Sequence, residues 1–224
     1  MNHDLSFYIT GIEQGMIAAL KKAVGKGDPD EGFAEDGYVR MIKGYDGELN
    51  ATALRSAISK MTTSFPLIFV TYINGKDARA SWDSGLPDEP MTMRRDCRFA
   101  AVVCSNDARG TEARRVGAPG SVGVYQMEAD AVTALGGLRV ERQDGSEKVL
   151  LTLAPLTPSG DSPIMQVPGV TAFAAYFDTY FEYDLPDRRA VEPIVIEEII
   201  FGLDPLNTPG RPGELPGVQG NQLR

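Results

Sequence analysis

The fold is decided by one stretch of sequence, Met93-Arg-Arg-Asp-Cys-Arg-Phe-Ala-Ala-Val-Val-Cys104. Its apolar side chains lie two residues apart, so Cys97, Phe99 and Val103 point to one side of a β-strand. Arg98 and Val102 fall on the other side. We therefore predict a strand over residues 93–104 that is buried on one face and partly covered on the other.

The residues after this strand predict a loop and then a helix. Residues 105–115 have no apolar period and contain Asn, Asp and Gly, which favour turns, so we predict a long loop. The next segment ends at Gly136-Gly137, and Ser121 is available to cap its start. Its apolar residues have helical spacing: Val122, Tyr125, Ala129, Val132 and Leu135.

Two more helices and several more strands are expected. An N-terminal helix from Leu5 has an apolar stripe that ends before Gly25, and a second helix starts near Asn50. Residues 67–73 are apolar and β-branched, which predicts the central strand, and residues 74–77 should turn the chain out. Residues 170–183 should form a long strand with an aromatic face. Short strands are predicted at residues 38–42 and 149–153 and, less distinctly, at 194–201, where a short helix is the alternative, and a loop at 155–168.

These elements predict an α+β fold. A single domain, residues 1–203, would hold a mixed β-sheet flanked by about three α-helices that share one face. Residues 204–224 are rich in proline and glycine and are expected to be disordered alone or ordered only on a partner.

Composition narrows the classes of function. The chain has 224 residues and a formal net charge of -9, which opposes broad binding to a phosphate backbone. No apolar run approaches the roughly 20 residues that cross a bilayer, and the N-terminus lacks the pattern of a secretory signal. We expect a soluble globular protein that does not bind membranes and is made in the cytoplasm.

Arginines concentrate between residues 93 and 115, a segment that contains six arginines and only three carboxylates. They can pair with carboxylates and solvent, contact another protein, or contact nucleic acid. The candidates for a subunit interface or a DNA-facing lumen are Arg94, Arg95, Arg109, Arg114 and Arg115. The only tryptophan, Trp82, is a candidate loop anchor or partner contact.

The sequence offers little material for catalysis. His3 is the only histidine, which removes most acid-base, triad and metal chemistry. The segment Pro119-Gly-Ser-Val-Gly123 lacks the first glycine of a nucleophile elbow, and no glycine-rich phosphate loop follows a strand. Acidic residues near Asp28 and Asp30 miss the EF-hand spacing. We expect no catalytic residue, cofactor or metal site, with a metal-dependent hydrolase built on Asp and Glu as a remote alternative. Cys97 and Cys104 should lie buried on opposite faces, too far apart for a disulfide.

Several short motifs resemble one family when they are taken in order. They are the N-terminal helix, residues 44–49, residues 65–70, Trp82, residues 106–115, Gly123-Val-Tyr-Gln126 and the aromatic strand. Together they resemble the Mu-like phage tail-terminator, or tail completion, family. The resemblance spans residues 5–184, and residues from Val191 onward depart from it.

The resemblance implies a structural virion protein without catalytic residues. Such a protein forms a homohexameric ring on the head-proximal end of the tail tube, stops tube and sheath polymerisation, and offers a docking surface to the neck. Its expected partners are itself, the tail tube and possibly the sheath protein, and the neck or connector protein, with DNA only as the passing genome. A neck or head-completion connector, or another minor tail subunit, is the alternative.

Overall fold

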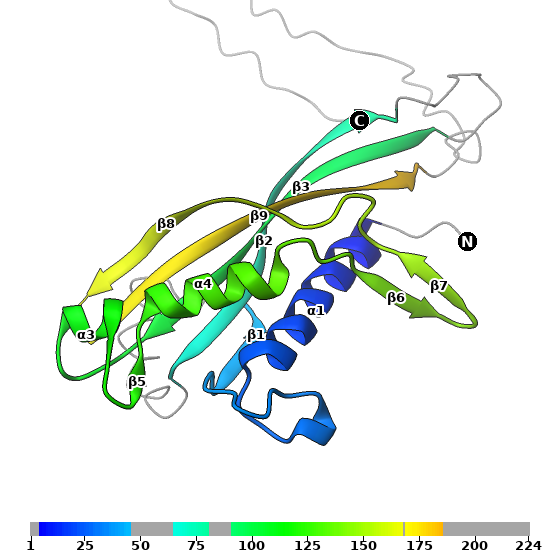
Figure 1. The fold of residues 1–224 in the computed structure, drawn as a ribbon. Coiled ribbons are helices and arrows are strands. Elements are labelled where there is room, and N and C mark those ends of the chain that lie inside the picture. Colours follow the sequence, from blue (N-terminus) through cyan, green and yellow to red (C-terminus); the bar gives the residue numbers. More distant parts are fainter. Residues whose placement is uncertain (1–4, 46–64, 81–90, 168, 186–224) are drawn as a thin grey trace, which may run out of the picture. The chain divides into compact units, whose positions relative to one another are not determined.

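The computed structural model describes residues 5–45, 65–80, 91–167 and 169–185, all within the first of two compact units, residues 1–188 (Figure 1). The elements in chain order are α1 (Leu5–Val24), a 3-10 turn (Pro29–Glu31), β1 (Met41–Gly44), β2 (Leu67–Arg79), β3 (Thr92–Ser105), α3 (Thr111–Val116), β4 (Gly117–Ala118), β5 (Ser121–Val122), α4 (Val124–Leu135), β6 (Glu141–Asp144), β7 (Glu147–Leu150), β8 (Thr157–Val167) and β9 (Val170–Asp184).

Five strands form one mixed sheet in the order β1-β2-β3-β9-β8. β1 runs parallel to β2, and the other neighbours are antiparallel. The α+β class and the mixed sheet are therefore confirmed. Residues 67–73 are not the central strand, as predicted, because β3 pairs along nearly its whole length with β2 on one edge and β9 on the other.

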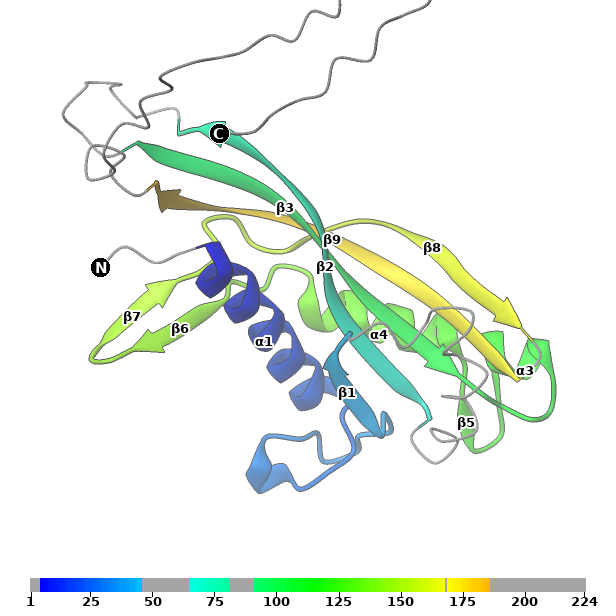
Figure 2. The same ribbon diagram turned by 180° about the vertical axis from the view of Figure 1, so that it is seen from behind.

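Helices α1 and α4 cover the same face of the sheet, as predicted (Figures 1 and 2). The apolar stripe of α1 is confirmed, since Ile12, Met16, Leu20 and Val24 are buried. The helices pack on alternate residues of the strands, where β3 contributes Cys97, Phe99, Ala101 and Val103 and β9 contributes Ala175, Phe177 and Phe181. This is the main core of the described residues.

The opposite face of the sheet carries a second buried cluster, to which β3 contributes Ala100, Val102 and Cys104. The predicted strand with two covered faces is therefore confirmed. Both cysteines are free, buried and on opposite faces. Burial raises the pKa of Cys97 to about 12 and raises that of Cys104 as well, which keeps both groups as unreactive thiols.

The predicted start of the third helix was wrong. Ser121 does not cap it, because Ser121 and Val122 form β5, which pairs with β4. Helix α4 begins at Val124 after Gly123, which makes no side-chain cap. A side-chain carbon on Gly123 would lie 2.4 Å from the backbone nitrogen of Gly117, so the tight β4–β5 corner delays the helix. Its buried residues are Val124, Met127, Ala131 and Leu135, and only the last belongs to the predicted stripe.

The predicted loop at residues 105–115 is also partly wrong, because Thr111–Val116 form the short helix α3. It buries a single side chain, that of Arg114. An apolar period could not reveal a helix that is anchored by a polar residue.

Strand β2 is longer than predicted. Asn74 and Gly75 do not turn the chain out, and the strand continues to Arg79 with a bulge between Tyr72 and Asn74. The bulge accommodates one extra residue, so the strand stays paired with β3 through a segment whose composition is typical of turns.

The predicted loop at residues 155–168 is instead the edge strand β8. Its pairing register with β9 shifts twice, once after Pro158 and once after Pro163. Proline cannot donate a backbone hydrogen bond and is tolerated in sheets at edges and bulges, which is where β8 places both. The aromatic strand predicted at residues 170–183 is confirmed as β9.

Strands β6 and β7 form a separate hairpin around a turn at Gly145 and Ser146. Helix α1 lies close to the base of this hairpin because two glycines four residues apart leave room. A side-chain carbon on Gly11 would lie 2.4 Å from Leu151, and one on Gly15 would lie 2.3 Å from Val140. The short strands are shifted from their predicted positions, from 38–42 to β1 and from 149–153 to β7.

Several predictions lie outside the described residues. These are the helix from Asn50, most of the motif at residues 44–49, Trp82, the segment 194–201 and the tail 204–224. Among the described residues, no helix is long and apolar enough to cross a membrane.

Candidate interaction surfaces

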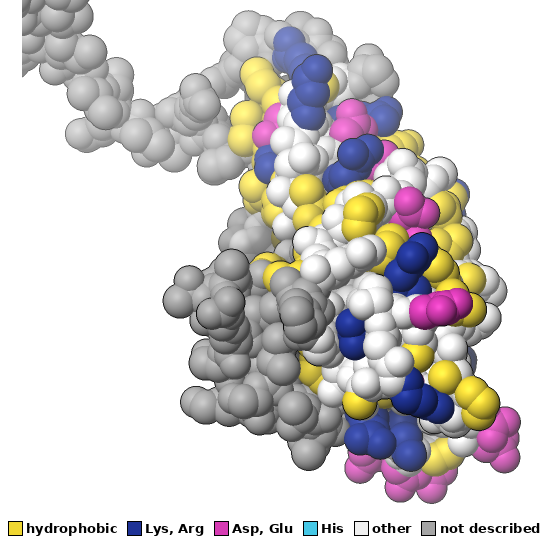
Figure 3. Space-filling model, turned by 90° about the vertical axis from the view of Figure 1, so that its left-hand side faces the viewer, with side chains coloured by type: hydrophobic (Ala, Val, Ile, Leu, Met, Phe, Trp, Pro, Cys, Tyr) yellow, Lys and Arg dark blue, Asp and Glu magenta, His cyan; other side chains and the backbone are white. Residues whose placement is uncertain are grey.

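The candidate arginines lie in two places. Arg94 and Arg95 belong to the part of the sheet where β2, β3 and β9 run on past β1, and Arg109, Arg114 and Arg115 surround α3 at the other end of β3. Figure 3 shows Lys and Arg side chains spread along one face of the molecule with Asp and Glu between them, rather than gathered in one basic patch.

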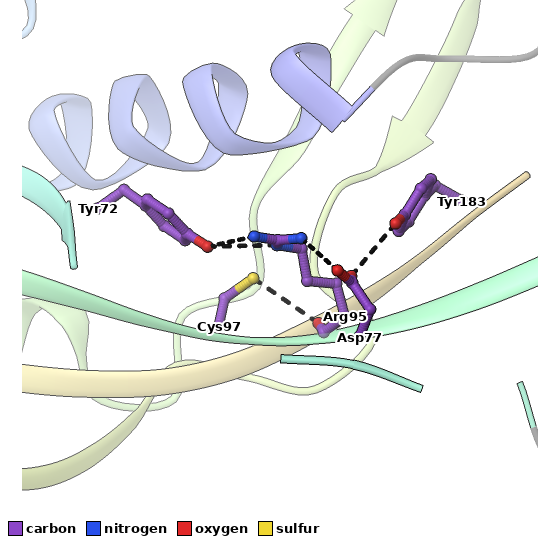
Figure 4. Close-up of polar contacts among 5 residues, drawn as sticks. All are labelled: Tyr72, Asp77, Arg95, Cys97 and Tyr183. Atoms are coloured by element: carbon purple, nitrogen blue, oxygen red, sulfur yellow. Dashed lines mark hydrogen bonds and ion pairs between the residues drawn. The ribbon is translucent and has the colours of Figure 1, made fainter. Parts of the chain in front are cut away.

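Arg95 lies at the centre of a polar cluster on the helix-covered face (Figure 4). Its Nε and Nη2 atoms donate to the Tyr72 hydroxyl at 3.2 and 2.8 Å, and Nη1 donates to Asp77 Oδ2 at 2.7 Å. The Tyr183 hydroxyl donates to the other oxygen of Asp77 at 3.2 Å. This cluster links β2, β3 and β9.

The β2 bulge makes this cluster possible. Tyr72 and Asp77 are five residues apart and would point to opposite faces of a regular strand. The extra residue of the bulge lets Tyr72 pair with Phe99 and Asp77 with Arg95, so both side chains reach the same face. A side-chain carbon on Gly75 would lie 2.5 Å from the Tyr72 hydroxyl and 2.7 Å from Arg95 Nε, so the site also needs glycine there.

Arg94 points to the opposite face from Arg95, where it lies over the Tyr180 ring at 3.8 Å and pairs with Asp96 at 2.8 Å. The neighbouring Arg98 binds both oxygens of Asp178, at 2.8 and 2.9 Å. These residues line an open hollow of about 860 Å³. Its arginines are already matched by carboxylates, so the hollow offers no concentrated charge to a ligand.

Arg109 and Arg114 are both bound within the chain. Arg109 pairs with Asp107 at 2.7 Å and donates to the Pro119 carbonyl at 3.0 Å. The hydrogen bond from Arg109 is the main reason that the pKa of Asp107 lies well below its usual range. Arg114 is only 6% exposed and donates to Thr171 Oγ1, the Asp107 carbonyl and Thr111 Oγ1. It holds α3 against β9 and the preceding loop.

Arg115 differs from the other four candidates. It is exposed, and its guanidinium donates to the Tyr125 hydroxyl, with Nε at 2.7 Å. Tyr125 is 38% exposed and packs edge-on against Phe173, and Val116 beside Arg115 is 65% exposed. Among the described residues no carboxylate pairs with Arg115. We call Arg115, Val116 and Tyr125 the α3 corner.

Sequence reasoning missed the phenols and the carboxylate that hold these arginines. Tyr72, Asp77 and Tyr125 lie far from their partners in sequence, and only the sheet register and the α3–α4 packing bring them together. Trp82, the remaining candidate, lies outside the described residues. No group of three or more His, Cys, Asp or Glu side chains within the described ranges could hold a metal ion.

A pair of carboxyl groups links α4 to the edge strand β8. Burial raises the pKa of Glu128 to about 7, and the hydrogen bond with Asp161 and its negative charge add to the shift. Two carboxyl groups can share a hydrogen bond only when one of them is protonated.

Glu128→Gln is expected to reduce the pH dependence of stability. The pKa of Glu128 is higher in the folded chain than its ordinary 4.5, so folding is favoured by proton uptake. Its contribution is fully present below about pH 4.5 and is lost as the pH rises through about 7. The melting temperature of Glu128→Gln, measured relative to that of the wild type, should therefore rise between pH 5 and pH 8. Thermal scans at each pH test this, with exposed Glu112→Gln as the control, and a constant difference across the pH range would contradict it.

Comparison with known proteins adds one match. A family model described as Bacteriophage Mu, Gp37 matches residues 8–182, from the first turn of α1 to near the end of β9. No curated protein matches the chain.

Proposed function

Because the chain belongs to the Bacteriophage Mu, Gp37 family, we propose that it is a structural subunit of the virion that terminates the phage tail. In this proposal it forms a homohexameric ring at the head-proximal end of the tail tube. The ring stops tube and sheath polymerisation and provides the surface on which the neck docks, without any enzymatic step. It is assembled in the host cytoplasm, and DNA meets it only as the passing genome.

The match over residues 8–182 is the observation that carries the proposal, since it covers nearly all of α1 and of the five-stranded sheet. Two features of the sequence support the finer role. The short motifs that resemble tail terminators occur in order along the same region, and the single histidine leaves little material for catalysis.

Electron microscopy of phage particles made without this chain tests the proposal. If the chain terminates the tail, its loss should give tail tubes longer than those of the wild type, without attached heads. Supplying the wild-type chain from a plasmid should restore tube length and infectivity. Tubes of normal length that lack heads would instead identify a neck or head-completion connector, and intact particles would contradict both roles.

A further inference from the structure

We propose that the α3 corner binds the acidic segment 28–36 of a second copy of this chain. This contact would join neighbouring subunits, so it rests on the proposed ring. It uses two different surfaces of the protein, which is the kind of contact that closes a ring of identical subunits.

The α3 corner is built to receive a carboxylate. The guanidinium of Arg115 is held by the Tyr125 hydroxyl rather than by an acid, so its charge is ordered and not compensated. Arg94, Arg95 and Arg109, in contrast, each have a carboxylate partner at 2.7–2.8 Å. The exposed Val116 and the ring of Tyr125 place apolar surface next to this charge. Arginine and tyrosine beside an apolar side chain are typical of residues that contribute most at protein interfaces.

The complementary surface lies after α1. Residues 28–36 carry five exposed carboxylates and no basic residue: Asp28, Asp30, Glu31, Glu35 and Asp36. No ion pair within the described residues engages any of them, so the segment is the uncompensated acidic counterpart of Arg115. Its shape is fixed, because Asp28 accepts from the Asp30 backbone at 2.9 Å and Gly32 ends the turn with a positive φ. A fixed loop loses little conformational entropy when it binds.

A protein partner fits the corner better than DNA. Binding to a phosphate backbone needs several cations that track it, and each neutralised phosphate adds to the salt dependence. Arg114 is buried and Arg109 is neutralised by Asp107, which leaves Arg115 as the one exposed, unpaired arginine among the three around α3.

A charge-reversal cycle in assembled particles tests the contact. Arg115→Glu and the double change Asp30→Lys with Glu31→Lys should each weaken subunit association by about tenfold or more, measured as ring occupancy on tails against protein concentration. All three changes in one chain should restore association to within about threefold of the wild type. Lys148→Glu, on the exposed β6–β7 hairpin, makes the same charge change elsewhere and should leave occupancy unaltered.

A second variant tests the apolar part of the corner. Val116→Asp should lower ring occupancy while the thermal unfolding of the purified chain stays unchanged, because this side chain is exposed. The cycle also separates the two proposals. Normal rings with Arg115→Glu, or no rescue in the combined variant, would overturn the contact and leave tail termination standing. Normal rings that lose their genome would place Arg115 on the DNA path. If the wild type forms no ring at all, both proposals fail.

Discussion

Replacing Arg114 with alanine is expected to lower the free energy of unfolding by about 2–4 kcal/mol, although it is a single surface-loop arginine by sequence. Its guanidinium lies in the interior and makes hydrogen bonds to Thr171, Thr111 and the carbonyl of Asp107. Removal leaves the buried Thr171 hydroxyl and the half-buried Asp107 carbonyl without this donor and frees α3 from β9. Urea denaturation followed by circular dichroism measures the change.

Arg115→Ala is the matched control, since it removes the same side chain one position along the same helix. Its hydrogen bond to Tyr125 is exposed, so the expected cost is below about 1 kcal/mol. Equal midpoints for the two variants would contradict the structural division between a buried anchor and an exposed contact. Reversing the charges of Arg114 and Arg115 together would not distinguish an unfolded chain from a folded chain that lacks the subunit contact. The two positions therefore have to be changed separately.

The sequence predicts the parts of this fold that follow a simple period. Alternation along β3 and β9, and the four-residue and three-residue steps of α1, depend on residues close together in the chain. The same periods also predict which side chains of these elements point inward, because among the described residues those side chains share one main core. The position of β3 at the centre does not follow, since the apolar run of β2 is the more continuous of the two and only pairing reveals their order.

The failures share a physical cause, which is that tertiary packing overrides local preference. β8 contains two prolines and a glycine that favour a loop, yet β9 supplies a pairing edge with bulges that accommodate them. β2 runs through Asn74-Gly75, typical of a turn, because the neighbouring β3 continues beside it. Helix α3 forms around a buried arginine instead of an apolar stripe. No local pattern encodes any of these partners.

The sequence identified the arginines of the candidate site but not what each of them does in the fold. The concentration of arginines between residues 93 and 115 was visible in the sequence, while the Asp178, Asp77 and Tyr125 groups that engage Arg98, Arg95 and Arg115 come from distant segments. Four of those six arginines therefore act as parts of internal ion pairs, with Asp96, Asp77, Asp178 and Asp107 as their partners. Within the described residues of this segment, only the α3 corner remains for an external partner. The structure therefore limits the interface hypothesis to a few residues, which the number of arginines in the sequence could not do.

Replacing Phe177 with alanine is expected to cost about 3–5 kcal/mol of unfolding free energy, the largest effect of any single change considered for this chain. Phe177 lies directly across from Phe99 on β3, and both side chains are fully buried beneath the helices. Truncation removes a ring from the middle of the main core and leaves a cavity that two paired strands cannot close. Urea denaturation of the purified chain measures the loss.

Tyr180→Ala provides the comparison, because the half-buried Tyr180 lies on the same strand but points to the face opposite the helices, where Arg94 stacks on it. Its expected cost is about 1 kcal/mol, since most of the lost contact is with a solvent-exposed arginine. Similar losses for the two variants would contradict the assignment of the main core to the helix-covered face. A large loss for Phe177→Ala alone would also explain why core variants cannot test the ring. They would remove the folded chain before any subunit contact formed, whereas Arg115→Glu and Val116→Asp change only what the folded chain presents to its neighbours.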